Sequence, residues 1–156
     1  MATTVVPALI DAIVAFATEA LPDLIVYDGL GASDDPGDFL MVGVSDPEIE
    51  SADTGADAQQ DWATVGRQGA RSEQGEVTCV ALSWNGGSGN AAQKQARDAA
   101  YATVAAVEDF CRDDPTLEVP TLLWNSALTS HSLLQNQDEL GTLAMVTFRI
   151  AFQARI

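Results

Sequence analysis

Residues 142–156, with the sequence TLAMVTFRIAFQARI, alternate apolar and polar side chains and predict a long β-strand. Side chains of a strand alternate between its two faces, so the apolar ones are expected to share a face. These are Ala144, Val146, Phe148, Ile150, Phe152 and Ala154. Residues 121–135 predict a second long strand, joined to the last one near 137–141. The chain therefore ends in a sheet that is apolar on one side.

Two amphipathic helices are predicted to cover that side. Residues 4–21 place apolar side chains at three- and four-residue steps, with Thr4 as a cap and Pro22 as a stop. Residues 91–112 form an alanine-rich helix whose small side chains would let it lie close to a sheet. Further extended segments are expected at 24–27, 39–44, 59–68 and 76–84, with an acidic loop at 45–58 and a turn at Gln74-Gly75. This order predicts an α+β fold, with one mixed or antiparallel β-sheet and two helices packed on it in a single domain, 1–156.

The charge of the chain is strongly acidic. It has 156 residues, 7 basic and 23 acidic, for a formal net charge of −16 and a pI near 4.1. Residues 1–61 hold 13 of the acids and no base. A surface of this kind repels nucleic acid and anionic membranes, so we expect neither as a binding partner.

No residue pattern indicates an enzyme or a cofactor site. The one histidine, His131, has serines on either side, and strand neighbours point to opposite faces, so they form no triad. Cys79 and Cys111 lie too far apart in sequence to predict a metal site with a single histidine. The acidic loop departs from the EF-hand pattern, because Ser51 stands where the turn glycine belongs. A divalent ion held by its clustered carboxylates stays an open alternative.

Self-association fits the remaining features better. The predicted strand 76–84 carries apolar side chains on both faces, and the bases are confined to the later part of the chain. If the acidic part of one copy meets the more basic part of the next, the contact is heterologous, which gives rings or filaments.

Several stretches together resemble a known family. They are Val26-Tyr27-Asp28-Gly29, Asp38-Phe39-Leu40-Met41-Val42-Gly43-Val44 with Asp46-Pro47, Gln60-Asp61-Trp62-Ala63 leading through Gly66 to Arg71 and Glu73, Gly75-Glu76-Val77-Thr78-Cys79-Val80-Ala81 with Ser83-Trp84-Asn85-Gly86, the helix beginning near Arg97-Asp98, and the closing strand 148–156. In this order and spacing, the chain resembles the tail terminators of long-tailed bacteriophages, particularly those of actinobacterial hosts.

The resemblance implies a structural virion protein without catalytic residues or cofactors. It implies a hexameric ring that caps the head-proximal end of the tail tube, stops its polymerisation and joins the head connector, with DNA passing through the lumen. Assembly would occur in the host cytoplasm. Interface candidates nominated from the sequence are Asp46, Glu48, Glu50, Asp53, Asp57, Trp62, Arg67, Arg71, Arg149 and Arg155. A head-completion or connector adaptor of the neck, and a small-ligand binding module, are the alternatives.

Overall fold

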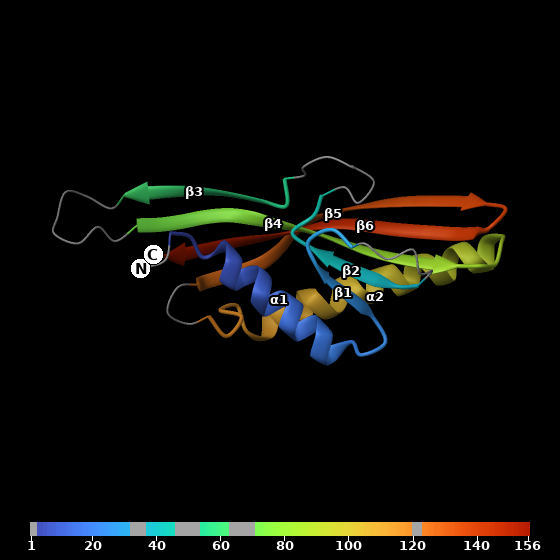
Figure 1. Ribbon diagram of the computed structural model, residues 1–156, viewed down its shortest axis with the longest axis horizontal. Helices are drawn as coiled ribbons and strands as arrows, with labels where there is room; N and C mark the ends of the chain where they lie inside the picture. Colours follow the sequence, from blue (N-terminus) through green and yellow to red (C-terminus); the bar gives the residue numbers. More distant parts are fainter. Residues whose placement is uncertain (1–2, 32–36, 46–53, 63–70, 120–122) are drawn as a thin grey trace.

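Two helices and six strands make up the fold of the computed structural model, which describes residues 3–31, 37–45, 54–62, 71–119 and 123–156 (Figure 1). In chain order they are α1 (Val6–Ala20), β1 (Ile25–Asp28), β2 (Phe39–Val42), β3 (Ala56–Trp62), β4 (Arg71–Asn85), α2 (Asn90–Asp113), β5 (Leu123–Asp138) and β6 (Gly141–Arg155). The predicted α+β fold, with two helices on one mixed sheet, is confirmed.

The long strands β4 and β6 form the centre of the sheet. Their antiparallel ladder runs from Ser72 opposite Arg155 to Asn85 opposite Thr142. The strand order is β1-β2-β4-β6-β5. β3 pairs with the first half of β4, on the same side of β4 as β2, which pairs with the second half. Only β1 and β2 run parallel to each other, and the other pairs are antiparallel. The other strands therefore join the sheet by pairing with β4 or β6, except β1, which pairs with β2.

Both helices pack on one face of this sheet. The alternation predicted for the last strand is confirmed, because all six of its apolar side chains on that face are buried. From α1 they meet Leu9, Ile13 and Ala17, and from α2 a row of small residues that includes Ala96 and Ala100. Burying one such large apolar side chain contributes about 1.5–3 kcal/mol. The core thus lies between the helices and one side of the sheet (Figure 1).

The turn expected at Gln74-Gly75 is wrong, since both residues lie inside β4. Gly75 serves a different purpose there. A Cβ on Gly75 would come within 2.1 Å of the backbone oxygen of Asp57, so only glycine lets β3 approach β4 this closely. The loop expected over 45–58 is also wrong at its end, because residues 56–58 belong to β3.

A buried carboxylate fixes the start of α1. The N-cap residue is Val5 rather than the expected Thr4, and it makes no side-chain capping bond. Glu73 of β4, only 2% exposed, accepts hydrogen bonds from the Val5 N–H at 2.7 Å, from the Thr4 hydroxyl and from the Gln60 amide at 3.2 Å. A negative charge at a helix N-terminus also interacts favourably with the positive end of the helix dipole. Glu73 therefore ties α1 and β3 to the same point of β4.

Removing this carboxylate leaves the buried Val5 N–H without a partner. We expect Glu73→Ala to lower the free energy of unfolding by about 1–3 kcal/mol, measured by urea denaturation. Glu76→Ala, three residues along the same strand, removes an exposed ion pair with Arg149 and a long, exposed hydrogen bond from Thr129, and should cost less than about 1 kcal/mol. Equal losses in the two variants would contradict this role for Glu73.

Both cysteines are free and buried in the core. Burial raises the pKa of the Cys79 thiol from 9.0 to about 12, and burial likewise raises the pKa of Cys111. Above pH 9 the unfolded chain releases the Cys79 proton while the folded chain keeps it, so raising the pH favours unfolding.

The free energy of unfolding is therefore expected to fall as pH rises from 9 towards 12, by up to about 1.4 kcal/mol per pH unit for this thiol. Urea denaturation at several pH values measures the slope. Cys79→Ala should reduce the slope, because it removes one of the titrating groups. An identical slope in that variant would exclude Cys79 as the source.

Candidate assembly surface: the open sheet face and its edges

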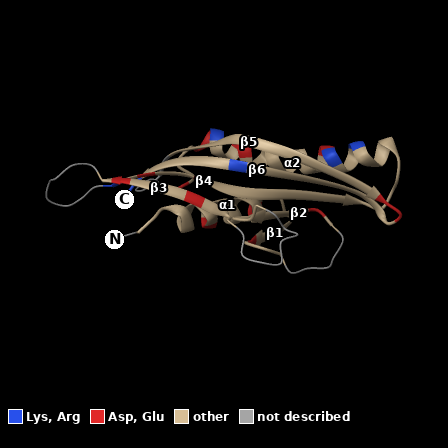
Figure 2. Cartoon of the chain, turned by 90° about the horizontal axis from the view of Figure 1, so that it is seen from above, with Lys and Arg blue, Asp and Glu red and all other residues tan. Residues whose placement is uncertain are grey.

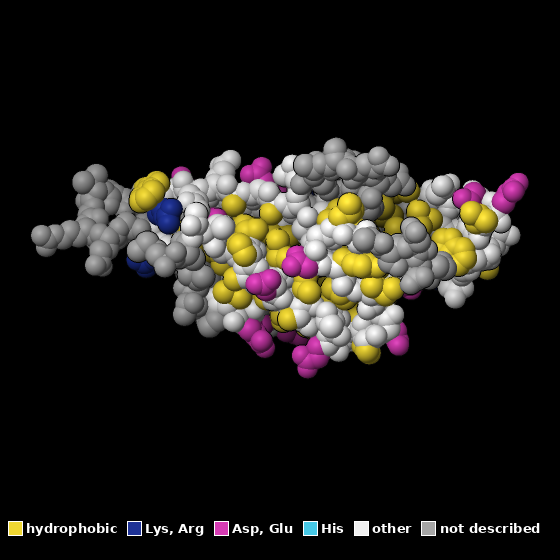
Figure 3. Space-filling model, viewed as in Figure 1, with side chains coloured by type: hydrophobic (Ala, Val, Ile, Leu, Met, Phe, Trp, Pro, Cys, Tyr) yellow, Lys and Arg dark blue, Asp and Glu magenta, His cyan; other side chains and the backbone are white. Residues whose placement is uncertain are grey.

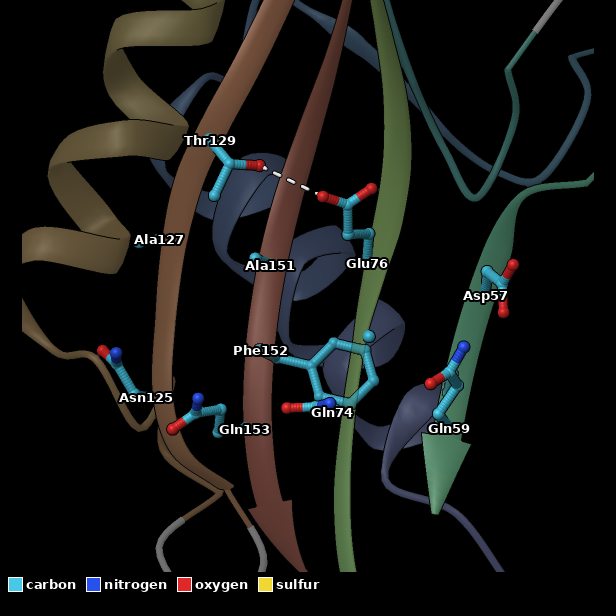
Figure 4. Close-up of a pocket in the computed structure, with 12 residues that line it drawn as sticks. Asp57, Gln59, Gln74, Glu76, Asn125, Ala127, Thr129, Ala151, Phe152 and Gln153 are labelled. Carbon is cyan, nitrogen blue, oxygen red and sulfur yellow. Dashed lines mark hydrogen bonds between the residues drawn. The ribbon is translucent and has the colours of Figure 1, made fainter. Parts of the chain in front are cut away.

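The face of the sheet opposite the helices forms a shallow polar groove over β3, β4, β6 and β5. The groove has a volume of about 500 Å³, and Figure 4 shows its polar side chains projecting from four adjacent strands. The lining residues are Asp57, Ala58, Gln59, Gln74, Gly75, Glu76, Asn125, Ala127, Thr129, Ala151, Phe152 and Gln153. Apart from two carboxylates the lining is uncharged, and it contains no thiol, histidine or lysine. Its amide, hydroxyl and carboxylate groups can form hydrogen bonds.

Arg149 crosses this face to a partner in its own chain. Its guanidinium lies 3.3 Å from the Glu76 carboxylate, and both side chains are exposed. The Thr129 hydroxyl lies 3.5 Å from Glu76 and 3.5 Å from the Arg149 carbonyl oxygen, so the three residues tie β4, β6 and β5 together. The sequence had offered Arg149 as a base for a neighbouring copy, but the structure gives it an acid within the subunit.

Three of the nominated residues meet at one end of the sheet. Trp62, 71% exposed, ends β3 opposite Arg71, whose guanidinium lies 4.9 Å from the centre of its ring. Arg155 ends β6 one row away, opposite Ser72. Figure 3 shows Lys and Arg side chains at this end of the visible face and Asp and Glu elsewhere on it. Exposed Asp57 lies further along β3. Asp46, Glu48, Glu50, Asp53 and Arg67 lie outside the described residues.

The most distinctive surface was not among the nominated residues. From Leu123 to Gln137 the sequence has no acidic or basic residue, although the chain carries 30 of them. These residues form most of β5, which is the last strand on its side of the sheet. Every residue from 129 to 140 is exposed. In Figure 2, β5 is tan along most of its length, with acidic residues at the hairpin tip. The missing charges were visible in the sequence, but the edge position was not.

An exposed edge strand of this length normally carries protection against pairing. Natural edges are short, charged, bulged or interrupted by proline. The register of β5 shifts between Leu123 and Asn125 and between Leu128 and Ser130, but the stretch after Ser130 is regular up to Asp138. Among the described residues, no backbone group on the outer side of this stretch bonds to another strand. The edge is thus open to pairing.

Other candidate chemistry is accounted for within the fold. His131 on β5 contacts Tyr101 of α2, with its Nδ1 3.1 Å from the tyrosine hydroxyl, which fastens the helix to the strand. The described ranges contain no group of three or more metal-ligating His, Cys, Asp or Glu side chains. Neither described helix has the length and apolarity needed to cross a membrane.

Comparison with known proteins adds no family to this geometry. No protein-family model matches the sequence, and no curated protein matches it.

Proposed function

We propose that this chain is a structural virion protein that caps the head-proximal end of a phage tail tube. In this role six copies form a ring, stop further polymerisation of the tube and join the tail to the head connector. The observation that carries the proposal is the uncharged edge of β5, which lies on the opposite side of the sheet from the edges of β1 and β3.

The two edges of the sheet differ from each other and lie on opposite sides, which suits a head-to-tail contact between identical subunits. Such heterologous contacts close into a ring when the rotation between neighbours divides a full turn, and otherwise form filaments. Both helices lie on the same face of the sheet, so neither blocks these two sides (Figure 1). The count of six comes from the resemblance to tail terminators.

The charge of the chain suits a ring through which DNA passes without binding. With a net charge of −16, the subunit repels phosphates, and its few bases are partly paired within the chain. In the proposed virion the lasting partners are other copies, the tube protein and the head connector or head-completion protein. DNA is only passing cargo.

Native mass and tube growth test this function together. We expect a closed species of six times 16.4 kDa by native mass spectrometry, favoured by salt because salt screens repulsion between acidic subunits. Added to growing tail tubes, the protein should shorten them and appear at one end by electron microscopy. An unrelated protein of similar pI is the control, because it reproduces the charge alone.

Other outcomes favour the alternatives. A species of twelve copies that leaves tube growth unchanged would indicate a connector adaptor of the neck. A monomer that fails to assemble on tubes at any salt concentration would contradict the ring. A small ligand that raises the melting temperature of such a monomer would assign the groove of β3, β4, β6 and β5 to ligand binding.

A further inference from the structure

Two rows of apolar side chains cross the sheet from edge to edge. On the open face the paired residues are, in order of strands, Ile25, Phe39, Leu82, Met145 and Leu134. On the helix face the adjacent row is Val26, Leu40, Ala81, Val146 and Leu133. Each row begins on β1 and ends on β5.

The centre of the helix-face row is buried and the centre of the open-face row is half-buried, whereas three of the four row ends are exposed. Leu40, Ala81 and Val146 are inaccessible to solvent. At the β5 end, Leu134 is 50% exposed and Leu133 is 38% exposed, and at the β1 end Ile25 is 38% exposed. Large apolar residues at both edges of the same rows indicate that the rows continue into another molecule.

The direction of the strands allows the same sheet to continue. β1 and β2 run antiparallel to β4, whereas β5 runs parallel to β4 because each is antiparallel to β6. A second copy placed beside the first in the same orientation therefore sets its β1 antiparallel to β5. Antiparallel pairs need no crossover and place opposing side chains in contact.

Charge also favours this pair of edges over the edge of β3. The β5 segment from 129 to 137 has no charge, and β1 has none before its last residue, Asp28. β3 carries Asp57 and Asp61. It also lies beside the first half of β4, whereas β1 lies level with residues 131–134 of β5.

We propose that β5 of one copy pairs antiparallel with β1 of a second copy, with Leu134 beside Ile25 and Leu133 beside Val26. The second copy supplies both the missing backbone partners of β5 and the cover for its leucines. This inference gives the ring of the proposed function its contact, and it requires only self-association of the chain.

A charge placed on the edge tests the contact. Leu134→Lys should raise the dissociation constant of self-association by about tenfold or more, because it buries an unpaired ammonium group in the contact. Ala105→Lys, at an exposed position of α2, adds the same charge elsewhere. Both substitutions lower the net negative charge, so general repulsion falls equally in the two variants. Weaker association of Leu134→Lys alone supports the edge, and equal behaviour of the two variants overturns it.

Disulfide formation tests the partner strand and the register. Opposing cross-strand Cβ atoms lie about 4.5–5.5 Å apart, near the range that a disulfide spans. Oxidation of Ile25→Cys/Leu134→Cys should give a covalent ladder of oligomers, whereas each single variant cannot extend beyond a dimer. Cys79 and Cys111 are buried and leave this result unaffected. Gln59→Cys/Asn125→Cys is the matched control for pairing through β3, because Gln59 and Asn125 end one row of paired residues on the same face of the sheet.

The outcomes separate this contact from the proposed function. If native mass spectrometry shows a ring but no disulfide-linked oligomers form through Ile25 and Leu134, or if they form through Gln59 instead, pairing through β1 is overturned and the ring is not. A ladder of open chains that never caps a tail tube supports the contact and overturns the tail function. A chain that stays monomeric and uncrosslinked at high salt contradicts both.

Discussion

The antiparallel ladder between β4 and β6 is the constraint on which the rest of the structure depends. It pairs the two strands along nearly their whole length, from Ser72 with Arg155 to Asn85 with Thr142. Because side chains alternate with a period of two, a slip of one residue would turn the apolar set of β6 away from the helices. The register of this ladder therefore fixes the core, the open face and the positions of all the outer strands.

The two faces of the ladder are covered differently. The helix face is closed by α1 and α2, and the Glu73 carboxylate holds the start of α1 against β4. The open face is polar where β3 joins the sheet and apolar where β2 joins it, with Met41 and Val80 buried there. No backbone bond of the described residues closes the outer sides of β1 and β5. Those sides are where the proposed contact adds a strand from a second copy.

Most of the few basic residues with described side chains form ion pairs within the subunit. Lys94 pairs with Asp98 and Arg112 with Glu108 on α2, while Arg149 pairs with Glu76 across the sheet. Exposed pairs of this kind contribute little stability. Their effect on the surface is to leave the unpaired carboxylates in control of its potential. On such a surface, the uncharged strip along β5 is where a second, like-charged copy meets the least electrostatic repulsion.

The sequence by itself determined the two helices, the last two strands and the apolar face of β6, because each follows from a short-range periodicity. The uncharged run that became β5 was equally readable. The turn at Gln74-Gly75 was wrong because the sequence shows a glycine but not the neighbouring strand that needs its space. Tertiary structure alone decided that β5 is an edge, that Arg149 meets Glu76, and that Ile25 and Leu134 end one row. Strand order joins residues more than a hundred positions apart, and no local pattern contains that information.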